Sequence, residues 1–315
     1  MTSLRRLGAS DLHVFPLALG GNVFGWSADE AQSFAVLDAY VAGGGNFIDT
    51  ADVYSAWAEG NEGGESETVI GRWLASRGNR SDVLIATKVG GHPKYKGLGA
   101  TNIKAAVEES LRRLGTDHLD LYYSHFDDES VPVEEIVTSL DQLVKDGKVR
   151  AVAASNISPE RLRASLDFAE AEGLTGYVAL QPHYNLISRA TYEGPLLDTV
   201  AAGGLAAVPY FGLASGFLTG KYRPGRTVDS VRAPRMTELL ESERGLRVLA
   251  ALDSVAEAHG AEPATVALAW LAARPTVAAP IASARTVEQL PALLAVADLT
   301  LTDTELATLT AASEE

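Results

Sequence analysis

The chain has 315 residues, 46% of them hydrophobic, and a formal net charge of −15 at pH 7, so it can bury a large core but is ill suited to binding nucleic acid or an anionic membrane surface. It contains no cysteine, which excludes disulfides, a thiolate nucleophile and cysteine metal ligands. No apolar run at the N-terminus resembles a signal peptide, and none elsewhere has the length of about 18 residues that spans a membrane, so we expect a cytoplasmic protein.

Short apolar runs alternate with longer helical patterns along the whole chain. Before the first repeat, residues 4–7 and 12–15 flank a Gly8-Ala9-Ser10-Asp11 turn and predict a hairpin. One helical pattern places Ile103, Val107 and Leu111 on a shared face. It ends at Gly115, a residue type that favours the C-cap position of a helix. The predicted strands are 17–20, 47–49, 83–88, 119–124, 149–154, 178–181, 206–210 and 277–281.

These elements predict an α/β fold, the (β/α)8 TIM barrel, as a single domain over residues 1–315. Several strand candidates are continuously apolar, which suits a parallel sheet covered on both faces. The alternative is a doubly wound sheet, but the Gly-x-Gly-x-x-Gly pattern that it requires is missing after the first strand. The N-terminal hairpin would then close the floor of the barrel.

Two long segments interrupt the repeat: residues 57–66 are rich in glycine and acidic residues, and residues 211–243 contain glycine, proline and arginine. Long loops in a compact domain are usually functional or disordered, and the loops that follow barrel strands form active sites. We therefore expect these long βα loops to belong to a functional site.

Four polar residues end or follow three of the predicted strands, namely Asp49, Tyr54, Lys88 and His125. An acid, a phenol, an ammonium and an imidazole at neighbouring strand ends can move a proton to or from a carbonyl oxygen. Tyrosine has a reference pKa of about 10, and a neighbouring ammonium favours the phenolate and so lowers that pKa. The set therefore predicts general acid–base chemistry with Tyr54 at its centre.

Two other chemistries use part of this set. Lys88 at a barrel-strand end could form a Schiff base, as in a class I aldolase, which would make the protein a lyase. A glycosidase would pair Asp49 with Asp127 or Asp128, but then Tyr54 and Lys88 have no role. The remaining histidines lack metal-ligand spacing, so we expect no metal site: His92, His118, His183 and His259.

A series of motifs carries a family resemblance. They are Gly45 to Ala51 followed by Tyr54, Ala86-Thr87-Lys88, Tyr122 to His125, Ser155-Asn156, Gln181-Pro182 with Tyr184 to Leu186, and Gly212 to Ala214 with Gly216 to Tyr222. In this order they resemble the aldo-keto reductase superfamily, over nearly all of the chain. Residues 60–67 resemble a bacterial branch of it with a Gly-Gly-x-Ser-Glu element.

The resemblance implies an oxidoreductase that interconverts aldehydes or ketones with alcohols by hydride transfer. Tyr54 would be the general acid or base, Lys88 would lower its pKa, Asp49 would position Lys88, and His125 would orient the substrate carbonyl. Trp26, Trp57 and Phe126 would line the substrate pocket. A slow-turnover regulatory protein on the same fold is the alternative, as in the potassium-channel β-subunits of the superfamily.

The resemblance also implies a nicotinamide cofactor, usually NADP(H), with NAD(H) as the alternative. The cofactor-binding residues would be Ser155, Asn156, Gln181, Tyr210, Phe211, Gly212, Leu213, Gly216, Leu218, Lys221, Ser283, Arg285 and Gln289. Tyr210 would stack on the nicotinamide ring, and Arg285 is the candidate for the 2′-phosphate. Two positions depart from the family pattern: Ser283 replaces an expected glycine, and Leu293 replaces an asparagine that often contacts adenine. The substrate, the reaction direction and the oligomeric state are not assigned from the sequence.

Overall fold

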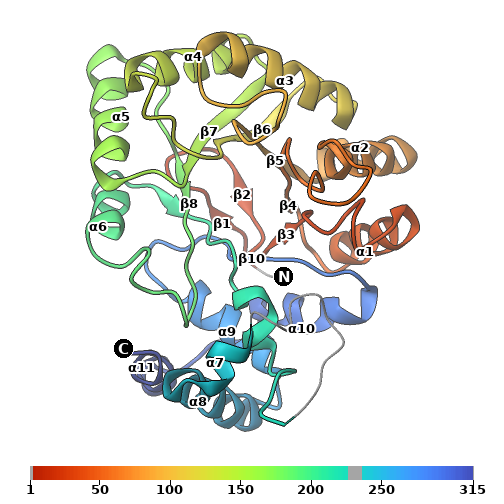
Figure 1. Ribbon diagram of the computed structural model, residues 1–315, viewed down its shortest axis with the longest axis vertical. Helices are drawn as coiled ribbons and strands as arrows, with labels where there is room; N and C mark the ends of the chain where they lie inside the picture. Colours follow the sequence, from red (N-terminus) through yellow and green to blue (C-terminus); the bar gives the residue numbers. More distant parts are fainter. Residues whose placement is uncertain (1–2, 226–235, 315) are drawn as a thin grey trace.

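The computed structural model describes residues 3–225 and 236–314 (Figure 1). The predicted long loop 211–243 is therefore described at both ends, and its stretch 226–235 lies outside the described residues. None of the helices in the described ranges is long and apolar enough to cross a membrane.

The centre of the fold is an eight-stranded parallel sheet with the order β10-β3-β4-β5-β6-β7-β8-β9. Its edges meet, because Ala207 and Val277 form a parallel bridge and the Ile281 N–H donates to Pro209 O at 2.9 Å. The sheet thus curls into the predicted barrel. Its strands are β3 (Ala18–Gly20), β4 (Phe47–Asp49), β5 (Leu84–Val89), β6 (Leu119–Ser124), β7 (Val149–Ser155), β8 (Ala179–Gln181), β9 (Ala206–Ala207) and β10 (Ile281–Ala282).

Helices surround these strands on the outside (Figure 1). The predicted face of Ile103, Val107 and Leu111 is buried, and Gly115 ends that helix in the left-handed region at φ 64°. The helices are α1 (Glu30–Ala42), α2 (Glu65–Arg77), α3 (Ala100–Leu114), α4 (Val133–Lys145), α5 (Pro159–Glu172), α6 (Pro195–Ala202), α7 (Thr237–Glu241), α8 (Glu243–His259), α9 (Pro263–Ala272), α10 (Leu290–Leu294) and α11 (Asp303–Ala312).

The predicted N-terminal hairpin is present as β1 (Arg5–Arg6) and β2 (His13–Val14), paired antiparallel. Its side chains Leu7, Leu12 and Val14 pack with the interior residues of the barrel in one apolar cluster. A larger cluster lies between the strands and the surrounding helices. The hairpin therefore supplies apolar side chains to the barrel interior.

Two predicted strands are shorter by several residues than the sequence indicated, whereas the other strand bounds differ by at most one residue at either end. The run 206–210 is a strand only at Ala206–Ala207, and the run 277–281 contributes only Ile281 to β10. Each run contains a proline, Pro209 or Pro280, which has no N–H to donate to a sheet ladder. The rest of each run still joins the two edges through the contacts described above.

Candidate active site

The carboxyl ends of five neighbouring strands bring the predicted polar residues to one end of the barrel. Asp49 is the last residue of β4, Lys88 lies near the end of β5, and His125 directly follows β6. Ser155 and Gln181 are the last residues of β7 and β8. Parallel strands in a closed barrel all end on the same side, so residues far apart in sequence meet there.

Lys88 is the centre of this group and is completely buried. Its ammonium donates hydrogen bonds to Asp49 Oδ2 at 2.8 Å, to Thr50 O at 2.7 Å and to Tyr54 Oη at 2.9 Å. An ammonium has three N–H donors, so every donor has a partner. This satisfies the charge that burial would otherwise make costly, and it fixes the ammonium beside the phenol.

The Tyr54 hydroxyl also lies 3.4 Å from Asp49 Oδ2, to which it donates. Burial, followed by the Asp49 carboxylate, raises the pKa of Tyr54 well above its ordinary value. The sequence predicted a lowered pKa because of Lys88, but burial and the Asp49 carboxylate raise it instead. Tyr54 therefore carries its proton at neutral pH, which is the form that a general acid needs.

His125 is buried next to Tyr54, with the two ring centroids 6.1 Å apart. Burial, followed by the positive charge of Lys88, lowers the pKa of His125 well below its ordinary value. Its Nδ1 is buried and has no hydrogen-bond partner among the described residues. A neutral imidazole in this position can donate one N–H to an oxygen atom placed near Tyr54.

The predicted nicotinamide-binding residues form a connected set beside these four. The Tyr210 hydroxyl donates to Asn156 Oδ1 at 2.9 Å, and Asn156 Nδ2 donates to Ser155 Oγ at 3.0 Å and to His125 O at 2.8 Å. Ser155 Oγ in turn donates to Gln181 O at 2.9 Å. The structure thus brings Ser155, Asn156, Gln181 and Tyr210 together, next to the predicted catalytic residues.

The segment after β9 turns sharply where the sequence predicted a phosphate-binding loop. It forms the short helix η2 (Ala214–Thr219), which contains Leu218, and Phe211, Ala214 and Ser215 all have positive φ angles between 46° and 56°. Gly212 is packed so closely that a Cβ atom would lie 3.2 Å from Ile281 O. Such backbone conformations are costly for residues other than glycine and gather at functional sites.

The predicted adenosine end follows β10. Ser283 Oγ donates to Asn22 Oδ1 at 2.5 Å, and the Arg285 backbone N–H donates to Gln289 Oε1 at 2.8 Å. The Arg285 side chain is exposed and forms no ion pair with residues in the described ranges. Leu293 packs into the core, so it does not replace the adenine contact that an asparagine would make there.

A nicotinamide cofactor fits the residues that this end of the barrel presents. Ser155, Asn156 and Gln181 carry the hydroxyl and amide groups that can hydrogen-bond a carboxamide, and the ring of Tyr210 is partly exposed beside them. Lys221 and Arg285 are exposed cations, and the Lys221 ammonium lies 4.9 Å from the centroid of the Tyr222 ring. These two positions could hold phosphate groups.

The three predicted substrate-pocket residues connect to the catalytic group through ring contacts. The centroid of Trp57 lies 6.0 Å from Tyr54 and 5.7 Å from Trp26, and Phe126 stacks on His125 at 4.4 Å. Their exposed fractions are 36% for Trp26, 50% for Trp57 and 49% for Phe126. Large apolar side chains left this exposed are typical of binding surfaces.

Sequence reasoning did not identify two further buried carboxyl groups whose charges act on Lys88, those of Asp52 and Glu67. Glu67 accepts a hydrogen bond from Thr87 Oγ1 at 2.6 Å and pairs with Arg113 at 2.6 Å. Asp52 is fully buried, and neither of its carboxylate oxygens has a hydrogen-bond partner in the described ranges. The available signals were the position of Asp52 between Asp49 and Tyr54, and Glu67 within the Gly-Gly-x-Ser-Glu element.

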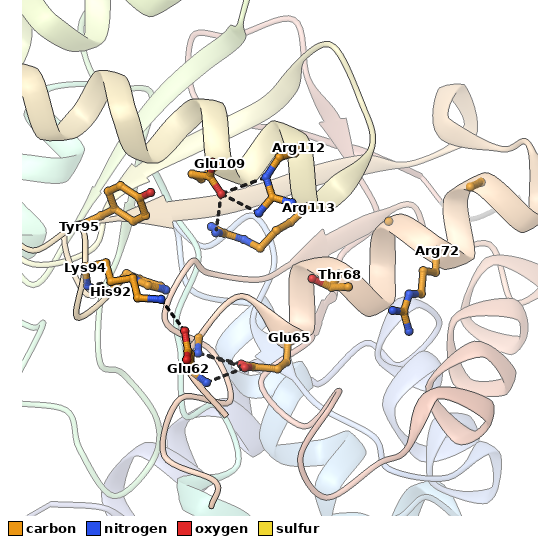
Figure 2. A pocket seen from close by; sticks show the side chains of 13 residues that line it. Glu62, Glu65, Thr68, Arg72, His92, Lys94, Tyr95, Glu109, Arg112 and Arg113 are labelled. Atoms are coloured by element: carbon orange, nitrogen blue, oxygen red, sulfur yellow. Dashed lines mark hydrogen bonds and ion pairs between the residues drawn. The ribbon is translucent and has the colours of Figure 1, made fainter. Parts of the chain in front are cut away.

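A charged groove of about 650 Å³ lies between α2 and α3 (Figure 2). Its cations face carboxylates that neutralise them, because Lys94 pairs with Glu62 and Arg112 with Glu109. None of the predicted catalytic or cofactor-binding residues lines it. We therefore place the candidate site at the carboxyl ends of the strands and not in this groove.

Comparisons with known proteins agree with this geometry. The model of the Aldo/keto reductase family matches residues 16–314. Uncharacterized oxidoreductase YrpG of Bacillus subtilis is 35% identical to this chain, covering 90% of it and 87% of YrpG. Aryl-alcohol dehydrogenase [NADP(+)] of Phanerodontia chrysosporium is 31% identical, covering 92% and 80%. A probable voltage-gated potassium channel subunit beta of rice (Oryza sativa subsp. japonica) is 33% identical, covering 89% and 86%.

Proposed function

This chain belongs to the aldo/keto reductase family, a family of oxidoreductases, and we propose that it is an NADP(H)-dependent enzyme that interconverts aldehydes or ketones with alcohols. The observation that carries the proposal is the Asp49–Lys88–Tyr54 hydrogen-bonded group, with a neutral His125 beside it. A protonated phenol next to a fixed ammonium and an imidazole suits proton donation to a carbonyl oxygen.

The proposed roles follow from these contacts. During carbonyl reduction, the Tyr54 hydroxyl gives its proton to the carbonyl oxygen, and the Lys88 hydrogen bond stabilises the phenolate that is left. His125 donates an N–H to the same oxygen and so orients the carbonyl group. In the reverse direction the phenolate accepts the proton of the alcohol. A nicotinamide cofactor held by the residues named below would supply the hydride in reduction and accept it in oxidation.

Other parts of the site are assigned to binding. We propose that Ser155, Asn156, Gln181 and Tyr210 hold the nicotinamide and that the 211–221 segment and Lys221 hold the pyrophosphate. Arg285 would bind the 2′-phosphate, which makes NADP(H) the preferred cofactor. The name of the Phanerodontia relative includes NADP(+), which supports this choice. Trp26, Trp57 and Phe126 would contact the substrate.

The test follows NADPH absorbance with the wild-type protein and a panel of aldehydes, ketones and keto-sugars, together with direct measurement of NADPH and NADH binding. Oxidation of NADPH that depends on the added carbonyl compound would support the reductase. The rice relative favours a second candidate, a cofactor-binding regulatory protein with slow turnover. Tight NADPH binding without turnover on any compound would favour that candidate, and no binding of either nucleotide would contradict both.

A further inference from the structure

One hydrogen bond connects the proposed cofactor-binding residues directly to a proposed catalytic side chain. Gln181 Nε2 donates to Asp49 Oδ1 at 2.8 Å, and both side chains are buried. In the strand order, β4 and β8 stand four places apart in the eight-stranded barrel, so they lie on opposite sides of it. The bond between the last residues of these two strands therefore crosses the barrel interior.

The Asp49 carboxylate is divided between two sets of partners. Its Oδ2 accepts from Lys88 at 2.8 Å and from Tyr54 at 3.4 Å, whereas its Oδ1 accepts from Gln181. The terminal torsion of an aspartate is broad, so a carboxylate bonded through one oxygen alone can turn. A second hydrogen bond to the other oxygen fixes that torsion and withdraws negative charge from the side that faces Tyr54.

We propose that Gln181 is a positioning residue for proton transfer, which holds the Asp49 carboxylate in the orientation that fixes Lys88 and Tyr54. This inference rests on the proposed function and adds to the cofactor contact proposed for the same side chain. One N–H of the amide is committed to Asp49, and the same side chain also faces the buried Tyr123 hydroxyl. Gln181 thereby connects the cofactor-binding residues with the acidity of Tyr54.

The position of Gln181 is itself well fixed. It ends β8, and the pairing of its backbone in register with Ser155 of β7 holds it there independently of the Ser155 hydroxyl, which also donates to its carbonyl oxygen at 2.9 Å. The Ser155 hydroxyl bonds to the Gln181 backbone and to the Asn156 side chain, and Asn156 contacts His125 at the backbone oxygen. Ser155 is therefore a matched control, because it belongs to the same proposed binding set without touching a catalytic side chain.

The experiment uses cofactor-free protein labelled with ¹³Cζ-tyrosine, in which the NMR signal of Tyr54 is identified by its loss in Tyr54→Phe. Gln181→Met preserves length but cannot donate, and we expect it to shift the Tyr54 signal because the Asp49 carboxylate is released. Ser155→Ala should leave that signal in place. At saturating cofactor, kcat of Gln181→Met should fall about tenfold, the kinetic equivalent of one hydrogen bond to a charged group.

Gln181→Asn serves as a second variant if the methionine protein does not fold, because its amide is too short to reach Asp49 and should shift the same signal. A Gln181 variant that binds cofactor more weakly but leaves the Tyr54 signal unchanged would overturn the proposal, and the proposed function would stand. If the wild type neither bound the cofactor nor turned over any substrate, the proposed function would be contradicted. The cofactor-free spectra would still decide whether Gln181 positions Asp49.

Discussion

The Lys88 ammonium donates to the Tyr54 hydroxyl at 2.9 Å and also lies 4.6 Å from the centroid of the same ring. Lys88 is completely buried, so solvent does not screen this contact. The phenol keeps its proton in the resting protein, and the nearby cation is in place to stabilise a phenolate once the proton has been transferred. A hydroxyl that is both protonated and prepared for its own ionisation is what a general acid requires.

Replacing Tyr54 with phenylalanine tests this relationship most directly. The ring contacts with Trp57 and His125 stay in place, and only the hydroxyl is lost. We expect kcat to fall by about 10²–10⁴, the usual contribution of a positioned acid or base, with cofactor affinity nearly unchanged. Steady-state kinetics and a fluorescence titration with NADPH give the two values.

Tyr95→Phe is the matched control, since Tyr95 lies in the groove between α2 and α3. It should leave both values at the wild-type level. If Tyr54→Phe abolished NADPH binding together with activity, the tyrosine would have a structural role instead.

The barrel and the main group of site residues could be predicted because both follow from short sequence patterns. Apolar runs alternating with helical patterns predict the parallel sheet, and a closed parallel sheet collects its strand ends on one side. Asp49, Lys88 and His125 each end or follow such a run, so their meeting follows from the topology. The hairpin was predictable for the same reason, from two short runs around a turn.

Contacts that depend on packing could not be predicted in this way. Asp49 and Gln181 are separated by 132 residues, and only the closed barrel places them opposite each other. The direction in which the pKa of Tyr54 shifts depends on how deeply the phenol is buried, and no sequence motif shows that burial. Strand β9 ends before Pro209 and β10 begins after Pro280, because proline has no N–H for the ladder even where apolar character continues.

Lys88→Met should destabilise the fold as well as abolish turnover. Asp49 is buried, and without the ammonium its charge would lose its cationic partner, which typically costs about 3–5 kcal/mol. Urea unfolding followed by circular dichroism measures the loss. Lys94→Met is the control, because the Lys94–Glu62 pair is exposed and its removal should leave the unfolding midpoint close to that of the wild type. Equal stability of the two variants would contradict a structural role for the buried pair.

Arg285→Ala should weaken NADPH binding about tenfold or more while changing NADH binding little. The guanidinium is exposed after β10, and a charge-assisted hydrogen bond to a 2′-phosphate has no counterpart in NADH. Equilibrium titrations with both nucleotides give the ratio of dissociation constants. Arg163→Ala, on an exposed part of α5, controls for the loss of one positive charge. An equal effect on both nucleotides would contradict the assignment of Arg285 to the 2′-phosphate.

Asp52→Asn should stabilise the protein by an amount that grows with pH. Burial, followed by the charge of Glu67, raises the pKa of Asp52 well above its usual value, so the folded protein binds this proton more tightly than the unfolded chain. The wild type therefore loses stability as pH rises above the unfolded pKa of about 4, at about 1.4 kcal/mol per pH unit until the folded pKa is passed. Asparagine has no proton to lose and avoids this loss.

Denaturant unfolding of wild type and variant between pH 4 and pH 8 measures the difference, which should be smallest at pH 4 and increase with pH. Glu170→Gln, on an exposed face of α5, controls for the removal of one carboxylate. A constant difference across this range would mean that Asp52 ionises alike in the folded and unfolded chain. In this buried cluster Asp49 pairs with Lys88 and Glu67 pairs with Arg113, whereas Asp52 forms no ion pair within the described ranges. Asp52 is the carboxyl group without a hydrogen-bond donor among the described residues, and its titration should therefore account for the pH dependence.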